Sequence, residues 1–487
     1  MSQEIRNLEP KALWNQFADL NAVPRPSKKE EQVIQFMKDF GNRLGLETFE
    51  DEIRNVIIRK PATPGMENRK PIVLQGHLDM VHQKNNDTVF DFETQGIEMY
   101  VDGDWVRAKG TTLGADNGLG VAAIMAVLES TDIPHPAIEA LFTIDEETGM
   151  TGALNLQGGI LQGQILLNLD TEEDDEIDIG CAGGIDVTAT AEYDEEDTPE
   201  GSVGYSITVK GLQGGHSGMD IHKGLGNANK IMNRLLFDGF DNFGLQIASI
   251  TGGSLRNAIP RESVAKVIIA AVYDEAFVFD MQQIVNEIKT EFKTTEPNLE
   301  IVFEKLTEVP TKVMPSIAQF YFVRSMYTAH NGVYRMSADF DNLVETSNNI
   351  AKVIVGEGQL TVQCLTRSSV ESSKMDLANA LRSAFELMGC EVEFSGAYPG
   401  WTPNPKSEIL DVLVGIYEKQ NNAKPNVVAC HAGLECGILG TNYPEMDMIS
   451  FGPTIHGAHS PDERASISSS QKFWKFFLEI LASIPAK

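Results

Sequence analysis

The adjacent carboxylates Glu146 and Glu147 lie just beyond an apolar run at residues 140–144, a pattern that predicts a buried strand followed by a loop. Neighbouring carboxylates repel each other, so a strand end is an unfavourable place for them unless a positive charge compensates. A divalent metal would supply that charge. One glutamate could then bind the metal while the other handles a proton, and the pair alone does not decide which does which.

Other side chains of metal-ligand type also follow predicted strands or lie in turns: His77, Asp79, Asp116, Asp170 and His459. The strands in question are the apolar runs at 72–74 and 165–169 and one that ends at Phe451. In an open α/β sheet, sites form outside the carboxyl ends of the strands. We therefore expect these side chains to gather at one edge of a sheet.

The predicted donors are imidazoles and carboxylates without a thiolate, a set that suits zinc and also cobalt or manganese. Five protein ligands are too many for one catalytic zinc with an open position. They fit two metals that lie about 3.5–4 Å apart and share a bridging carboxylate. Such a pair holds a water or hydroxide, and a nearby carboxylate can take its proton and pass it to a leaving amine.

Taken singly, each residue has an ordinary structural interpretation. A histidine after a strand is often structural, Asp116 could cap a helix, and Asp170 opens an acidic run that could be a solvated loop. Three independent strand ends that all deliver metal-type ligands favour the functional interpretation. A metal-binding protein without catalysis is an alternative, but it predicts no base beside the ligands.

Short apolar strands alternate with helices, which predicts an α/β fold with a mostly parallel sheet and helices on both faces. This domain is expected at residues 1–186 and 400–487. An inserted α+β domain is expected at 187–399, built from two ferredoxin-like β-α-β-β-α-β halves at about 203–303 and 315–396. Ser27-Lys28-Lys29-Glu30 has the form of a capping box and predicts the start of a helix.

Composition narrows the class of protein. The 487 residues carry a formal net charge of −31, which argues against nucleic acid or an anionic membrane as a partner. The five cysteines form no CxxC pair and suit a reducing compartment. The polar first residues and the absence of an apolar stretch near ~18 residues predict a cytoplasmic protein.

The joint motif set resembles the two-zinc aminopeptidase/carboxypeptidase superfamily, and within it the aminoacyl-histidine dipeptidases, also called peptidase D or β-Ala-His dipeptidases. The similarity runs essentially end to end. The motifs that carry it are Gly76-His77-Leu78-Asp79, Ala115-Asp116-Asn117-Gly118, Asp145-Glu146-Glu147-Thr148-Gly149, Asn168-Leu169-Asp170 and His459-Ser460-Pro461-Asp462-Glu463.

The resemblance assigns roles to these positions. It implies that His77 and Asp170 bind one zinc, that Glu147 and His459 bind the other, and that Asp116 bridges both.

It also implies that Glu146 is the general base and that Asp79 orients His77. A cis peptide bond is expected between Asp116 and Asn117.

The insert resembles the family's lid domain. His216, in Gly214-Gly215-His216-Ser217-Gly218, is expected to stabilise the oxyanion or the substrate. Asn257 matches a second position that contacts substrate, and Arg367 is a candidate for binding a substrate carboxylate. The segment at 431–437 opens a helix, where backbone N–H groups could hold a carboxylate, or Glu435 or His431 could face the substrate amine or imidazole.

The expected activity is hydrolysis of unblocked dipeptides, notably Xaa-His such as β-Ala-His, by metal-bound hydroxide. A tripeptidase or a deacylase of the same superfamily would use the same metals. A pseudoenzyme should have lost a ligand or the base, yet all are present. A doubled lid could supply His216 within one chain, whereas a single lid would usually need a partner subunit, so a homodimer stays open.

Overall fold

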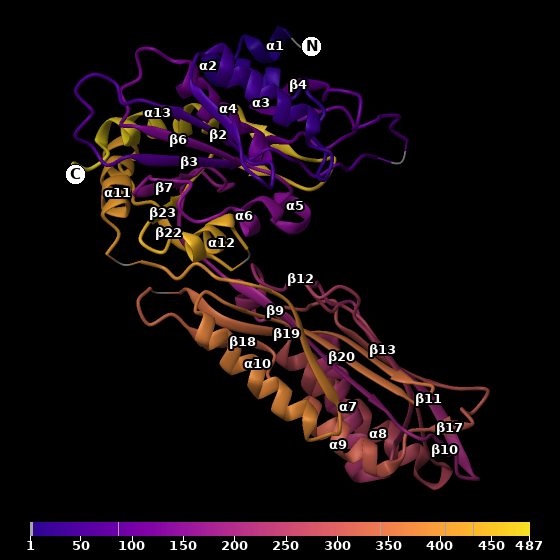
Figure 1. Ribbon diagram of the computed structural model, residues 1–487. Coiled ribbons are helices and arrows are strands. Elements are labelled where there is room, and N and C mark those ends of the chain that lie inside the picture. The colour runs from indigo at the N-terminus through magenta and orange to yellow at the C-terminus, as the bar shows by residue number, and fades with distance from the viewer. Residues whose placement is uncertain (1–2, 86, 341, 405, 432) are drawn as a thin grey trace. The chain divides into compact units, whose positions relative to one another are not determined.

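A computed structural model describes residues 3–85, 87–340, 342–404, 406–431 and 433–487. The chain forms two compact units (Figure 1). The first unit comprises Met1–Gly180, Trp401–Ala429 and Leu434–Lys487, and the second comprises Cys181–Gly400 and Cys430–Gly433. The sequence predicts 187–399 for the insert, and the second unit begins earlier because its first strand already starts at Gly183. The predicted polar start of the chain includes Met1 and Ser2, which lie outside the described residues.

An eight-stranded sheet forms the centre of the first unit. Its spatial order is β1 (Glu47–Glu50), β2 (Val56–Lys60), β6 (Ile138–Thr143), β3 (Ile72–His77), β7 (Ile165–Asn168), β23 (Asp447–Ser450), β8 (Glu176–Cys181) and β22 (Asn426–Cys430). The middle four strands, β6, β3, β7 and β23, run parallel to one another. The pairs β1–β2, β2–β6 and β23–β8 are antiparallel, so the predicted mostly parallel sheet is in fact mixed.

Helices cover both faces of this sheet. The helices of the first unit are α1 (Gln3–Arg6), α2 (Lys11–Leu20), α3 (Glu31–Arg43), α4 (Ala115–Glu129), α5 (Glu146–Gly149), α6 (Thr151–Asn155), α11 (Glu408–Asn421), α12 (Glu435–Asn442) and α13 (Ile467–Ser483). The almost wholly apolar α4 is buried against β3, while α6 and α12 pack a second apolar cluster on the other face (Figure 1). The middle strands are therefore buried on both sides and read as continuous apolar runs.

A small four-stranded sheet completes this unit, in the order β24 (Ile455–His456), β25 (Arg464–Ser466), β5 (Trp105–Ala108) and β4 (Met99–Asp102). It brings the segment after residue 455 beside the segment after residue 99.

The predicted capping box is wrong. The helix α3 has Glu30 as its N-cap residue and no side-chain cap bond. The Ser27 hydroxyl instead donates to Asp79 Oδ2 at 2.8 Å, and Glu30 Oε1 accepts the N–H of Lys28 at 2.8 Å. A long-range hydrogen bond to a buried carboxylate thus replaces the local one.

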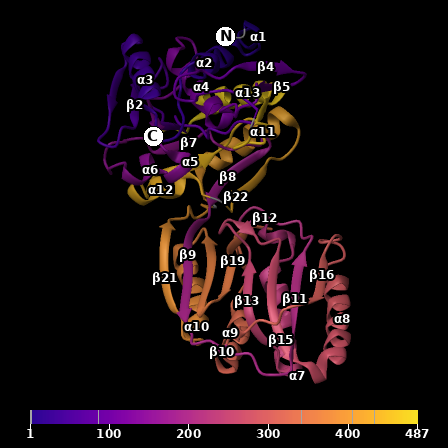
Figure 2. The same cartoon turned by 90° about the vertical axis from the view of Figure 1, so that its right-hand side faces the viewer.

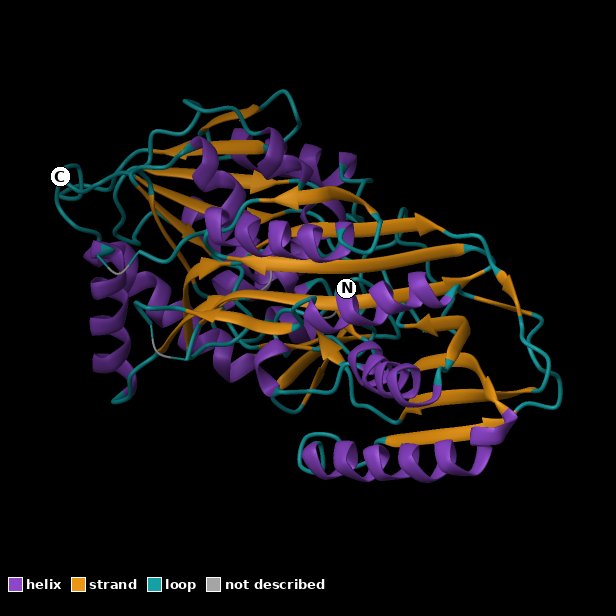
Figure 3. Ribbon diagram, turned by 90° about the horizontal axis from the view of Figure 1, so that it is seen from below, coloured by secondary structure: helices purple, strands orange, loops and turns teal. Residues whose placement is uncertain are grey.

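The second unit is built on a nine-stranded antiparallel sheet. Its main path is β16 (Glu300–Lys305), β11 (Ser202–Lys210), β15 (Ser263–Ala270), β13 (Gln246–Gly252), β19 (Val344–Gly356), β20 (Gln359–Ser368), β9 (Gly183–Glu192) and β21 (Glu391–Tyr398), and β18 (Gly332–Met336) pairs with β19. Two short pairs, β10 (Glu196–Asp197) with β17 (Lys312–Val313) and β12 (Gly215–His216) with β14 (Ala258–Ile259), lie outside it. The helices α7 (Ala228–Phe243), α8 (Asp274–Glu291), α9 (Ser316–Thr328) and α10 (Glu371–Glu386) cover one face (Figures 2 and 3).

The strand order reveals how the two halves of this sheet are made. The first half uses β11, α7, β13, β15, α8 and β16 consecutively. The second half uses α9, β19, β20, α10 and β21, and its remaining strand is β9, which precedes the whole first half in sequence and pairs with β20 and β21. The expected second half at 315–396 therefore lacks its first strand, which the chain supplies from residues 183–192.

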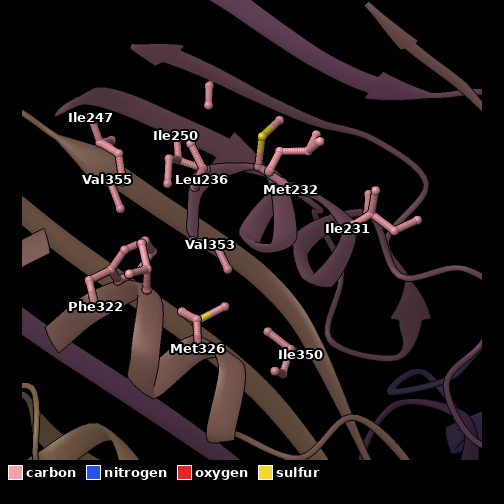
Figure 4. Close-up of a cluster of buried hydrophobic side chains, with 14 of the residues drawn as sticks. Ile231, Met232, Leu236, Ile247, Ile250, Phe322, Met326, Ile350, Val353 and Val355 are labelled. Carbon is pink, nitrogen blue, oxygen red and sulfur yellow. The ribbon is translucent and has the colours of Figure 1, made fainter. Parts of the chain in front are cut away.

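One apolar core runs across the join between the halves (Figure 4). Its labelled members come from α7, β13, α9 and β19: Ile231, Met232, Leu236, Ile247, Ile250, Phe322, Met326, Ile350, Val353 and Val355. Among the described helices of the whole chain, none combines the length and apolarity that crossing a bilayer requires.

The packing of α4 generates a stability prediction. A Cβ atom on Gly120 would lie 2.3 Å from the backbone oxygen of Leu169, so Gly120→Ala should destabilise the protein by about 1–3 kcal/mol through overpacking. Gly415 lies on an exposed face of α11 with open space around it, so Gly415→Ala should stabilise that helix by roughly 0.5–1 kcal/mol. Thermal unfolding midpoints should move in opposite directions. A fall of equal size in both variants would contradict this account of the packing.

Candidate functional site

The predicted site residues of the first unit follow the carboxyl ends of three adjacent strands. His77 is the last residue of β3, Glu146 and Glu147 open α5 after β6, and Asp170 follows β7. Because β3 lies between β6 and β7 and runs parallel to both, these ends meet at one edge of the sheet. Asp116, at the start of α4, and His459, after β24, reach the same edge.

The five predicted ligands form two groups of three that share Asp116. In the first, His77 Nε2 lies 3.1 Å from Asp116 Oδ1 and 3.5 Å from Asp170 Oδ1. In the second, His459 Nε2 lies 3.3 Å from Asp116 Oδ2 and 2.9 Å from Glu147 Oε2. The two oxygens of Asp116 therefore face different histidines.

Glu146 occupies a different position from Glu147. Its carboxylate lies 4.0 Å from His77 Nε2 and belongs to neither group that contains Asp116. The side chain is only 13% exposed, and burial raises the pKa of Glu146 well above its ordinary value. The charges of Asp170, Glu435 and Glu147 raise this pKa further, against the opposite effect of His77. A carboxyl group with a raised pKa is suited to accept and return a proton.

Asp79 links the end of β3 to the segment that follows β6. This fully buried carboxylate accepts the backbone N–H groups of Glu146 at 3.0 Å and Glu147 at 3.3 Å, as well as the Ser27 hydroxyl. Its Oδ1 lies 3.4 Å from His77 Nδ1. Burial acts to raise the pKa of Asp79, but the hydrogen bond and charge of His77 keep it below its ordinary value. One side chain thus contacts His77 and anchors both glutamates by their backbone, and the backbone carbonyl of Asp79 also lies 3.3 Å from His77 Nδ1.

The electrostatics of the cluster call for positive charge. Hydrogen bonds that the His459 imidazole donates to Asp116 and Glu147 raise the pKa of His459 to about 11. Burial alone would lower the pKa of His77, yet Asp170 and Asp116 raise it well above its ordinary value. Imidazole and carboxylate donors at these separations are the ligand types that zinc, cobalt and manganese take, so the residues present fit two divalent cations.

The segment around Asp116 has an unusual backbone. The peptide bond between Asp116 and Asn117 is cis, as the resemblance implies. The side-chain amide of Asn117 donates to Leu169 O at 2.6 Å and to Asp170 Oδ1, so this residue ties the Asp116 turn to the end of β7. His459 has a φ of +65°, a conformation that residues other than glycine seldom adopt.

Glu435 starts α12 and is wholly buried. Its Oε2 accepts hydrogen bonds from Gln75 Nε2 at 2.6 Å and Thr143 Oγ1 at 2.7 Å, whereas Oε1 has no hydrogen-bond partner among the described residues. Burial raises the pKa of Glu435 to about 7. Its contacts join β3 to β6 close to the predicted ligands. Ala432, in the same predicted helix-opening segment, lies outside the described residues.

The second unit holds His216, Asn257 and Arg367. The short strands β12 and β14 bring His216 beside Asn257, whose carbonyl accepts the Ser217 N–H at 2.8 Å. His216 Nδ1 accepts the backbone N–H groups of Gly218 and Met219, so its proton resides on Nε2. Burial, with the charge of Arg367, lowers the pKa of His216 to about 4. His216 is therefore a neutral Nε2–H donor.

Arg367 is a buried cation without an ion-pair partner in the described part of the chain. It is 4% exposed, donates to the Tyr398 hydroxyl at 2.8 Å, and leaves its Nε without a hydrogen bond. His431, the other candidate near this segment, bonds Ser347 Oγ at 2.8 Å, and burial lowers its pKa to about 3. Arg367 thus has the unmet donor capacity that a carboxylate could satisfy, whereas His431 is already engaged.

Several supporting residues escape sequence reasoning. Asn168, Ser450 and Thr171 continue the hydrogen-bond chain from Gln75 to the buried carboxylate of Asp178. Gln75 and Asn168 each stand two positions before a predicted ligand, within a run that is otherwise apolar. A polar residue inside an apolar strand was the available signal.

Comparisons with known proteins agree with this geometry. The profile of Peptidase family M20/M25/M40 matches residues 73–483. The chain is 44% identical, over 99% of its length and 100% of the relative, to the cytosol non-specific dipeptidase of Escherichia coli. The crystal structure of the aminoacylhistidine dipeptidase from Vibrio alginolyticus matches with a TM-score of 0.94 at 45% identity, covering 100% of this chain and 99% of that one.

A more distant structure, the aminopeptidase PepT from Bacillus cereus, shares the fold with a TM-score of 0.57 at 16% identity, over 98% of this chain and 99% of that one. The match to the family profile and the full-length identity place this chain among enzymes that hydrolyse peptide bonds. The chain belongs to Peptidase family M20/M25/M40.

Proposed function

We propose that this peptidase is a dinuclear metal dipeptidase that hydrolyses unblocked dipeptides, notably Xaa-His such as β-Ala-His. The observation that carries the proposal is the position of Asp116, whose two carboxylate oxygens face the two histidines of adjoining ligand groups. A single metal would need only one of these groups. The names of the Escherichia coli and Vibrio alginolyticus relatives support the dipeptide substrate, the Xaa-His preference and a cytosolic location.

Each metal would have its own ligands besides the shared Asp116. His77 and Asp170 would hold one cation, and Glu147 and His459 the other, with zinc as the native metal and cobalt or manganese as substitutes. When bound, the two cations supply Lewis-acid polarisation of the peptide carbonyl and acidify water. Asp79 keeps His77 in the orientation that leaves its Nε2 free to bind metal.

Glu146 is the proposed general base. Its neighbour Glu147 is directed to His459, whereas Glu146 lies beside His77 and outside both groups that contain Asp116. It accepts the proton of the attacking water and returns it to the nitrogen of the leaving amine. The raised pKa of Glu146 suits this second step, because a protonated carboxyl must be available at neutral pH.

The second unit is proposed to act as a lid that contributes substrate contacts and excludes long peptides. His216 would donate its Nε2–H to the oxyanion of the tetrahedral intermediate, since its neutral tautomer presents a proton there. Arg367 would bind the substrate carboxylate with its unmet donors, and the exposed Asn257 would contact the peptide. Glu435 is a candidate for the substrate amine through its unpartnered Oε1.

The catalytic assignment predicts that Glu146→Gln binds both metals yet loses about 10²–10⁴-fold in kcat, the contribution typical of a general base. His77→Ala should lose metal as well as activity. The measurements are steady-state kinetics and metal content after dialysis. The exposed Glu98, paired with Lys109, provides the matched control Glu98→Gln, which should behave as the unaltered protein. Wild-type turnover by Glu146→Gln would exclude Glu146 as the base.

The carboxylate contact generates a second prediction. For β-Ala-His and its C-terminal amide, the native enzyme should favour the free acid by about 10–100-fold in kcat/KM, the worth of hydrogen bonds to a charged group. Arg367→Gln should lower kcat/KM for the free acid to the value for the amide and leave kcat/KM for the amide unchanged. The surface variant Arg234→Gln, which loses an exposed ion pair with Glu291, is the control.

An unchanged preference for the free acid in Arg367→Gln would show that Arg367 does not bind the substrate carboxylate. Faster hydrolysis of a tripeptide or an N-acylated amino acid than of any dipeptide would contradict the dipeptidase assignment itself.

A further inference from the structure

A buried glutamate outside the ligand set holds the turn that carries Asp116. Glu463 accepts four consecutive backbone N–H groups: Leu113 at 2.6 Å, Gly114 at 2.9 Å, Ala115 at 2.7 Å and Asp116 at 3.2 Å. Each carboxylate oxygen accepts two of these N–H groups, so a single side chain satisfies all four donors. Glu463 is 2% exposed and has no basic residue within ion-pair distance among the described residues.

A buried arginine holds the same turn from its carbonyl side. Arg25 Nη2 donates to Gly114 O at 2.5 Å and to Asn21 Oδ1 at 3.0 Å. Its Nη1 donates to Leu78 O at 3.1 Å and Asp79 O at 2.9 Å, directly after the ligand His77. Arg25 is 1% exposed, and Cβ atoms on Gly114 or Gly118 would lie 2.6 Å from its Nη2. The guanidinium therefore fits a space that only glycine leaves open.

Together these two side chains link three ligand-bearing segments. Glu463 stands four positions after His459, and it fastens that loop to the turn of Asp116. Arg25 fastens the same turn to the end of β3, where His77 lies. Both side chains are buried, so the loss of either would leave several backbone groups of this turn without a hydrogen-bond partner.

We infer that Glu463 and Arg25 are positioning residues that set the separation of the two metal subsites by holding the Asp116 turn between the His459 loop and the His77 strand end. The inference rests on the proposed function, because it takes Asp116, His77 and His459 as metal ligands. Neither residue would touch metal or substrate. Their effect would be exerted through the backbone on either side of Asp116, in the manner of outer-shell groups that orient metal ligands.

Charge-conserving variants separate this role from simple electrostatics. Glu463→Asp keeps the negative charge but shortens the side chain, and Arg25→Lys keeps the positive charge but loses the fork that spans several carbonyls. A purely electrostatic influence on the cations would survive both changes. Positioning would not, because each variant withdraws hydrogen bonds from the Asp116 turn.

Glu139 supplies a matched control. It is another buried glutamate that accepts two backbone N–H groups, those of Gln162 at 2.6 Å and Gly163 at 2.9 Å. It lies near the amino end of β6, whereas the ligands follow the carboxyl ends of the strands. Glu139→Asp therefore weakens the same kind of contact, together with an ion pair to Arg59 at 3.0 Å, without touching a ligand segment.

The test is titration of the metal-free full-length proteins with Co²⁺, read by calorimetry and by the visible absorption of bound cobalt. We expect two sites in the native protein and in Glu139→Asp. In Glu463→Asp and Arg25→Lys, affinity should fall about 10–100-fold at one or both sites, with altered cobalt absorption. Thermal unfolding of the metal-free forms reports the structural loss separately, and Arg25→Lys decides the question if Glu463→Asp does not fold.

Three results would overturn the inference, and only the third would also overturn the proposed function. Native affinity and native cobalt absorption in both variants would refute the positioning role and leave the dinuclear site intact. An equal loss in Glu139→Asp would likewise refute it, since any buried glutamate would then have the same effect. Failure of the native protein to bind two Co²⁺ would refute the proposed function and this inference with it.

Discussion

Mutual repulsion among carboxylates is the constraint on which the first unit depends. Asp79, Asp116, Glu146, Glu147 and Asp170 gather at the carboxyl ends of three adjacent strands, close to two histidines. Two unit charges 4 Å apart interact by about 4 kcal/mol at an effective dielectric near 20, so several such pairs oppose folding by an amount comparable to the whole stability of a domain. Two divalent cations would offset this repulsion, and the raised pKa values of His77 and His459 express the same demand for positive charge.

The surrounding structure is organised to hold these groups in place. Asp79 anchors the two glutamates by their backbone, Asn117 ties the Asp116 turn to Asp170, and a chain of buried polar side chains runs beneath the strand ends from Glu435 to Asp178. The second unit repeats one of these devices. There the buried Glu296 accepts the N–H groups of Gln213 and Gly226 and so closes both ends of the loop that carries His216. In both units, loops that bear candidate functional side chains are fixed by internal acceptors.

Sequence reasoning predicted most of this arrangement where the signal is local. The apolar runs of β3, β6 and β7 gave the strands, and the ligand types at their ends gave the cluster that the structure brings together. It failed where the decisive partner is distant. Ser27 looks like a helix cap, yet its hydroxyl bonds Asp79, and β9 completes a half-sheet whose other strands lie more than a hundred residues away. The role of Arg25 could not be predicted from the sequence. Its carbonyl partners are backbone groups, which every residue type has. The antiparallel edges of the first sheet were missed for the same reason, since pairing direction is decided by chain connections rather than by strand composition.

The central claim is that Asp116 stands between two metal subsites. Anomalous diffraction from crystals of the zinc-loaded protein, recorded on both sides of the zinc absorption edge, tests it most directly. The account predicts two anomalous peaks about 3.5–4 Å apart, one against His77 and Asp170 and the other against Glu147 and His459, with Asp116 in contact with both. A single peak, or a pair of peaks of which Asp116 contacts only one, would contradict it.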